Sequence, residues 1–258
     1  MCRLLAYLGP PVTLRHIVTD PPFGLAHQAW SPRRQRYGNV NVDGFGVGWY
    51  ADGDPEPARY RQPGPIWADA SFADLARVTR TRALLAVVRS ATPGTEPGVA
   101  AVTPYAWGRW LFGHNGVLEG WPASAAELAA SLPPADLLGL AARCDSALAW
   151  ALVVARLRDG ASAAAALAGA VAALAAHGVT GRFNFALTDG RAIAATAAGD
   201  TLCYRVRDGG VTVASEPSDD APGWTDVADG SLLTATPAGA EVSPLPLTER
   251  EHERTAIQ

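Results

Sequence analysis

The sequence contains no lysine, and all 21 positions in its Lys+Arg count are arginine. Chemistry that depends on a lysine amine, such as Schiff-base catalysis, is therefore excluded. Cysteine is also scarce: Cys2, Cys144 and Cys203 are the only three, and no two form a Cys-x-x-Cys pair. This number and spacing argue against a zinc site built on cysteines and predict a reduced, cytoplasmic protein.

Long apolar runs and an excess of positive charge are absent as well. The most apolar stretch, residues 161–176, is mostly alanine and falls short of the roughly 20 residues needed to span a bilayer. The apolar run at residues 4–8 stops at Gly9-Pro10-Pro11 and is too short for a signal segment. The net charge of −4 offers no basic surface for nucleic acid. We expect neither a membrane nor a nucleic acid as a partner.

The order of the predicted elements indicates an α+β protein. Short strands come first, Ala- and Leu-rich helices follow, and short strands separated by Asp-Gly-type turns return, which favours antiparallel pairing over a doubly wound parallel sheet. We predict one domain over residues 1–258, with a core at 2–245 and a flexible tail at 246–258. The four strands between residues 183 and 214 predict a β-meander. Strands are predicted at residues 2–8, 45–50, 84–88, 110–112, 183–187, 192–196, 201–206, 211–214 and 232–235, and helices at 70–78, 125–131, 135–157 and 162–176.

Cys2 directly follows the initiator methionine. Removal of Met1 would place a thiol and a free α-amine on one residue, with reference pKa values of roughly 8.5 and 7.7–8.0. The neutral amine can then take the thiol proton, as in nucleophiles activated by an N-terminal amine. The alternative is an inert core cysteine on the first strand.

Two strand ends carry further polar groups. Arg89 follows the apolar strand at residues 84–88, and its planar fork suits a substrate carboxylate; the alternative is a surface arginine in an ion pair. The run Gly113-His114-Asn115-Gly116 follows the strand at 110–112. The Asn115 amide and the Gly116 N–H can stabilise an oxyanion, although Asn-Gly also predicts a tight turn. His114 is a weak acid–base candidate, and a packed or turn histidine competes with that role.

Asp145 lies in Cys144-Asp145-Ser146, near the start of an apolar helical stretch. Its carboxylate can accept hydrogen bonds from a substrate ammonium. The alternative is a helix N-cap, and the two roles are compatible.

These motifs, in this order, resemble the class II glutamine amidotransferases. Residues 41–49, Asn-Val-Asp-Gly-Phe-Gly-Val-Gly-Trp, are similar to an early strand of that family. The resemblance implies the four-layer αββα sandwich of N-terminal-nucleophile hydrolases. It also implies that Cys2 attacks a γ-glutamyl carbonyl, that Asn115 and Gly116 hold the oxyanion, and that Arg89 and Asp145 bind the glutamyl α-carboxylate and α-ammonium. Thr92 is implied beside the carboxylate, and Pro93 departs from the histidine common in synthase members.

A narrower resemblance points to the ergothioneine-pathway branch of the family, whose substrate is γ-glutamyl-hercynylcysteine sulfoxide. It rests on Asp20-Pro21-Pro22 and on residues 28–35, 67–72 and 214–224. The amine part of that substrate carries a trimethylammonium group, which aromatic residues can bind by cation–π contact. We predict a distal pocket from Trp30, Arg33, Arg34 and Asp43, while core packing of nearby aromatics such as Phe45 and solvation of the two arginines are the alternatives.

The predicted activity is therefore hydrolysis of a γ-glutamyl amide in a small-molecule substrate. It needs no metal and no organic cofactor, and with 258 residues we expect no second catalytic domain. The alternatives are a γ-glutamyl hydrolase of glutathione-like peptides, a general glutaminase, and a catalytically silent binding module on the same fold. The sequence carries no indication of oligomeric state.

Overall fold

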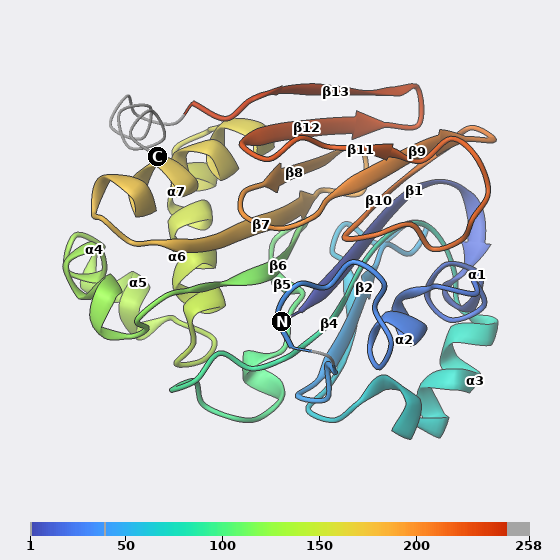
Figure 1. Cartoon of the computed structure of the whole chain (residues 1–258), viewed down its shortest axis with the longest axis horizontal. Helices are drawn as coiled ribbons and strands as arrows, with labels where there is room; N and C mark the ends of the chain where they lie inside the picture. The colour runs from blue at the N-terminus through green and yellow to red at the C-terminus, as the bar shows by residue number, and fades with distance from the viewer. Residues whose placement is uncertain (1, 39, 247–258) are drawn as a thin grey trace.

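Two antiparallel β-sheets face one another, and helices cover the outer face of each (Figure 1). The computed structural model describes residues 2–38 and 40–246, so the predicted tail at 246–258 lies almost wholly outside the described residues. The first sheet has the strand order β11-β9-β10-β1-β4-β2-β3, and the second has β13-β12-β8-β7-β6-β5. Every strand pair in the described chain is antiparallel.

Alternation of side chains along the strands separates three apolar layers. In β1, Leu4, Ala6 and Leu8 point between the two sheets, whereas Leu5 and Tyr7 point to the outer layer of α1 to α3. On the other side, α6 and α7 pack against the outer face of the second sheet. The predicted four-layer αββα sandwich is therefore confirmed.

The strands and helices have the following bounds. The strands are β1 Arg3–Thr13, β2 Phe45–Trp49, β3 Ala58–Gln62, β4 Arg80–Val88, β5 Tyr105–Trp107, β6 Trp110–Leu118, β7 Gly181–Thr188, β8 Ile193–Ala197, β9 Cys203–Arg207, β10 Gly210–Ala214, β11 Thr225–Asp226, β12 Ser231–Thr236 and β13 Gly239–Pro244. The helices are α1 Leu14–Val18, α2 Leu25–Gln28, α3 Ala70–Val78, α4 Ala126–Ala130, α5 Pro134–Leu138, α6 Asp145–Arg158 and α7 Ala163–Ala176, with 3₁₀ turns at Ile66–Ala68, Val99–Ala101 and Ala123–Ala125.

Two predicted elements are wrong in their extent or connection. The single helix expected at residues 135–157 is two helices, because α5 ends before Gly139 and α6 begins anew after its N-cap, Cys144. The expected meander at 183–214 is two hairpins in different sheets: β7 pairs with β8 in the second sheet, and β9 pairs with β10 in the first. The chain crosses between the sheets at residues 198–202.

The glycines of β2 allow another segment to approach closely, as their alternation predicts. A Cβ at Gly46 would lie 2.2 Å from the carbonyl oxygen of Thr103. The chain at residues 102–104 thus packs directly on β2, beside the cavity described below. No helix among the described residues is long and apolar enough to cross a membrane.

Candidate active site

Cys2 lies immediately before β1, at the edge of the layer between the two sheets. Its side chain is 8% exposed, and its sulfur donates to the carbonyl of Ser90 at 3.6 Å. Burial raises the pKa of the Cys2 thiol, and the Ser90 carbonyl contact and the nearby Arg89 charge oppose that rise. The thiol is therefore held in its neutral form in this arrangement.

Arg89 follows the last residue of β4 and remains buried, with 7% exposure. Its guanidinium donates to the carbonyl of Asp43 at 3.1 Å and to the hydroxyl of Thr95 at 3.2 Å. No carboxylate of residues 2–38 or 40–246 forms an ion pair with it. The surface ion pair considered from the sequence is therefore wrong, and neutral acceptors hold a buried cation.

Asp145 is the first residue of α6 and not its N-cap, as the alternative had it; Cys144 holds the N-cap position, and its side chain makes no capping hydrogen bond. One carboxylate oxygen of Asp145 accepts from the Thr92 hydroxyl at 2.8 Å and from the Leu118 amide at 3.2 Å. The other accepts from the Ser146 amide at 2.8 Å. The carboxylate is 3% exposed in total, and the described chain provides it with hydrogen-bond donors but no cation.

One narrow cavity brings these groups together. Five of the predicted site residues line it, namely Cys2, Arg89, Thr92, Gly116 and Asp145, and its volume of about 10 Å³ has room for about one water. His114, the weak acid–base candidate, also lines it. The remaining lining residues, which the sequence patterns did not single out, are Ser90, Ala101, Thr103, Cys144 and Ser146.

Gly113-His114-Asn115-Gly116 lies within β6, not at a turn, because β7 pairs with β6 along its whole length through residue 118. A Cβ at Gly116 would lie 1.8 Å from the Arg182 carbonyl, so the strand pairing itself requires glycine there. His114 contacts the same carbonyl with Nε2 at 3.0 Å and the Ser146 hydroxyl with Nδ1 at 2.9 Å. Since a carbonyl only accepts, Nε2 carries the hydrogen. Burial lowers the pKa of His114, consistent with a packed, neutral imidazole.

Asn115 points to the opposite face of β6 and does not line the cavity. Its side-chain amide donates to Asp200 and to the Ser215 hydroxyl, both at 3.3 Å. Its carbonyl oxygen is buried without a hydrogen-bond partner. Both N–H bonds of the Asn115 side-chain amide are thus engaged elsewhere in this arrangement.

The residues predicted for a distal pocket each make contacts of their own. Asp43 accepts from the Ala91 amide at 2.7 Å and so braces the loop that carries Arg89.

Arg33 pairs with Asp220, and Arg34 pairs with Asp226, which excludes the freely solvated alternative. Trp30 is 55% exposed and packs on His27, and Phe45 lies in the core. None of the four predicted residues lines the cavity of Cys2 or the larger pocket beside Tyr105.

The sequence did not predict a buried cluster of charged side chains next to Cys2, formed by Arg3, Asp200 and Glu216. Arg3 is fully buried, and its guanidinium lies 3.7 Å from both Asp200 and Glu216. Asp200 also accepts from Asn115, and Glu216 accepts from the backbone amides of residues 33 and 34. The presence of Arg3 in the otherwise mostly apolar segment at residues 2–8 could have indicated a buried ion pair. No group of three or more His, Cys, Asp or Glu among the described residues is placed to hold a metal.

Comparison with known proteins identifies the family of this chain. Residues 1–210 match the family of class II glutamine amidotransferases. Two γ-glutamyl-hercynylcysteine sulfoxide hydrolases are each 39% identical to this chain over 95% of its length, one from Mycolicibacterium smegmatis and one from Mycobacterium tuberculosis. The match covers 100% of the first protein and 97% of the second.

Solved structures show the same fold. A glutamine aminotransferase class-II domain protein from Silicibacter pomeroyi superposes with a TM-score of 0.68 and 27% identity, over 95% of this chain and 99% of that one. The glutamine phosphoribosylpyrophosphate amidotransferase of B. subtilis superposes with a TM-score of 0.64 and 16% identity, over 96% of this chain and 50% of that one. This chain belongs to the class II glutamine amidotransferases.

Proposed function

We propose that this chain hydrolyses a γ-glutamyl amide through Cys2, and that γ-glutamyl-hercynylcysteine sulfoxide is its substrate. One observation supports the reaction most strongly: a buried arginine and a buried aspartate, Arg89 and Asp145, line the same cavity as Cys2 without pairing with each other. The α-carbon of a glutamyl group carries a carboxylate and an ammonium. Such a zwitterion would neutralise both buried charges at once.

The first half of the reaction makes a thioester. After Met1 is removed, the α-amine of Cys2 takes the thiol proton, and the sulfur attacks the γ-carbonyl carbon. The Gly116 N–H, which lies on the cavity wall, donates to the developing oxyanion. A second donor from the Asn115 amide would require that side chain to leave Asp200 and Ser215 on the other face of β6. The C–N bond then breaks, and the leaving amine takes the proton held by the α-ammonium.

The second half releases glutamate. The α-amine accepts a proton from water, and the resulting hydroxide attacks the thioester carbonyl. The C–S bond breaks, the thiolate regains its proton, and glutamate leaves. Arg89, assisted by Thr92, and Asp145 hold the glutamyl group in the same position during both halves, which spares the entropic cost of a second binding event.

The substrate proposal rests on the two mycobacterial relatives, which the chain matches over nearly their whole length. We expect glutamate release from γ-glutamyl-hercynylcysteine sulfoxide with a kcat/KM at least about tenfold above that for glutathione or glutamine. A preference for glutathione would support a γ-glutamyl peptide hydrolase, and a preference for glutamine a general glutaminase. Absence of glutamate release from all three would contradict the proposal and favour a silent binding module. The Cys2→Ala variant is the control.

A further inference from the structure

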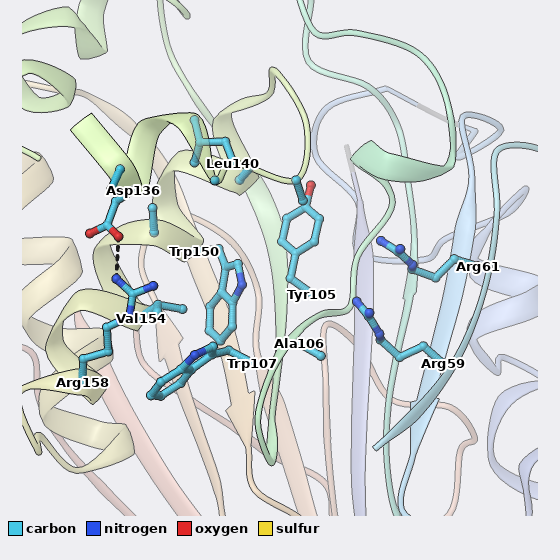
Figure 2. A pocket seen from close by; sticks show the side chains of 15 residues that line it. Arg59, Arg61, Tyr105, Ala106, Trp107, Asp136, Leu140, Trp150, Val154 and Arg158 are labelled. Carbon is cyan, nitrogen blue, oxygen red and sulfur yellow. Dashed lines mark hydrogen bonds and ion pairs between the residues drawn. The ribbon is translucent and has the colours of Figure 1, made fainter. Parts of the chain in front are cut away.

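A second pocket, of about 290 Å³, lies outside the cavity of Cys2. β3 forms one side of it, β5 its base, and α5 and α6 the other side. Figure 2 shows Arg59 and Arg61 reaching in from β3 toward Tyr105, with Trp107 and Trp150 between them and the Asp136–Arg158 pair. The Tyr105 hydroxyl contacts the Cys144 sulfur at 3.2 Å. Because Tyr105 lines this pocket and Cys144 lines the cavity of Cys2, these two side chains form part of the wall between them.

The charge of the pocket is positive although the net charge of the chain is −4. Its ionisable lining consists of Arg59, Arg61 and Arg158 with a single carboxylate, Asp136, besides the Tyr105 phenol. Asp136 is already paired with Arg158. Arg59 and Arg61 have no carboxylate partner among residues 2–38 and 40–246. A bound anion would supply the counter-charge that the described chain does not.

The two arginines are also held in place before any ligand arrives. They are two residues apart on β3, so their side chains leave the same face of the strand. Arg59 donates to the Pro104 carbonyl at 3.3 Å, and Arg61 donates to the Val102 carbonyl at 2.9 Å. Each guanidinium has five N–H groups, so donors remain for a ligand. Arg61 is half-buried and Arg59 is exposed. Partial burial lowers the pKa of both arginines, and the Arg61 charge lowers that of Arg59 further, so a bound anion would reduce the repulsion between these like charges.

Aromatic rings form much of the remaining pocket wall. Trp150 stacks on Phe112, with 5.1 Å between the ring centroids, and is 8% exposed, so packing holds its ring in place. Trp107 is 38% exposed, with the Arg158 guanidinium 5.9 Å from its ring centroid. Aromatic walls alone would also suit a quaternary ammonium, but two unneutralised guanidinium groups repel a cation.

We propose that this pocket binds a small planar aromatic oxyanion, a carboxylate or a phosphate, with its anionic group on Arg59 and Arg61 and its ring against Trp107 and Trp150. This site is independent of Cys2 and of the γ-glutamyl reaction. The shared chemistry is an oxyanion gripped by two planar guanidinium groups.

Calorimetric titration of the full chain tests the proposal with matched ligands. We expect indole-3-acetate or phenyl phosphate to bind with a Kd of ~1 mM or tighter, and the better of the two identifies the anionic group. Indole-3-acetamide, which keeps the ring without the charge, should bind at least about tenfold more weakly than indole-3-acetate. Equal binding of acid and amide, or no binding of either anion, would overturn the proposal.

Variants locate the site. Arg61→Gln should weaken binding of the anion at least about tenfold, and Trp107→Leu should weaken it while keeping the difference between acid and amide. Arg80→Gln is the matched control, because Arg80 also donates to a backbone carbonyl, that of Pro11, but does not line the pocket. The Cys2→Ala variant should bind the anion as well as the parent chain does. Loss of binding in Cys2→Ala, or unchanged binding in Arg61→Gln, would contradict this location.

Discussion

Replacement of Arg89 by methionine should separate activity from stability. Arg89 is buried without a carboxylate partner in the described chain, and two neutral oxygens, those of Asp43 and Thr95, accept from it. Methionine keeps a long, flexible apolar stem and removes the charge. If Arg89 binds the α-carboxylate of the substrate, the variant loses one partner of a buried charge pair, which costs about 2–5 kcal/mol. The kcat/KM should then fall by about 30-fold to about 5,000-fold.

The stability of the same variant should change much less. Two hydrogen bonds are lost, at about 1 kcal/mol each, while the cost of burying an unneutralised cation is removed. We therefore expect the free energy of unfolding to fall by less than about 2 kcal/mol. Arg80→Met is the matched control, because Arg80 lies at the exposed start of the same strand, β4. Its kcat/KM should stay within about twofold of the parent value.

Steady-state glutamate release and urea denaturation measure the two quantities. A kcat/KM of Arg89→Met within about threefold of the parent value would refute the assignment of Arg89 to the substrate carboxylate. A loss of activity that merely follows unfolding of the variant would show a structural role. The Thr95→Val variant adds a check, because it removes a hydroxyl that accepts from Arg89 and donates to the Thr92 carbonyl but leaves the Arg89 charge in place, so it should reduce kcat/KM less than Arg89→Met does.

Two further predictions concern buried groups around the cavity. Arg3→Met leaves Asp200 and Glu216 as buried carboxylates without their cation, so urea denaturation should show a loss of about 3–5 kcal/mol, and adding Glu216→Gln should recover part of it; an unchanged stability of Arg3→Met would contradict the cluster. Because burial holds the pKa of His114 below 6.5, the unfolded chain binds a proton that the folded chain does not, so the free energy of unfolding should decrease as the pH falls from about 6.5 toward that lowered pKa. His114→Gln should flatten this dependence, and an equal slope in parent and variant would contradict it.

Local sequence patterns predicted much of the fold because its layers depend on alternation. In β4, successive apolar residues alternate between the inner layer and the outer layer, and the run could only be a buried strand. The helix over 70–78 was predicted with its observed bounds, and the structure adds Asp69 as its N-cap. The break between α5 and α6 was missed because Ala and Leu favour a helix locally. Tertiary contacts override that preference, because Cys144 lies outside the helix and its sulfur contacts the Tyr105 hydroxyl.

In the candidate site, too, some residues could be placed from the sequence and others could not. Arg89 and Asp145 were recognisable because each stands beside an apolar element that must end at a cavity or at the surface. The position of Asn115 could not be recognised from the sequence. Because residues 113–116 lie within β6, which pairs with β7, Asn115 and Gly116 face opposite sides of the strand. Arg3 escaped because its partners, Asp200 and Glu216, lie about two hundred residues away in the sequence. The ion pairs of Arg3 form only when the folded sheets bring these distant parts of the chain together, so a local sequence pattern cannot predict them.

The most direct test of the proposed mechanism is the mass of the N-terminal peptide from active enzyme treated with a γ-glutamyl diazoketone. We predict a peptide that begins at Cys2, without Met1, and carries a single adduct on the sulfur, with loss of activity in proportion to labelling. A catalytically active population that retains Met1, or an adduct on Cys144 or Cys203 with Cys2 unmodified, would contradict it.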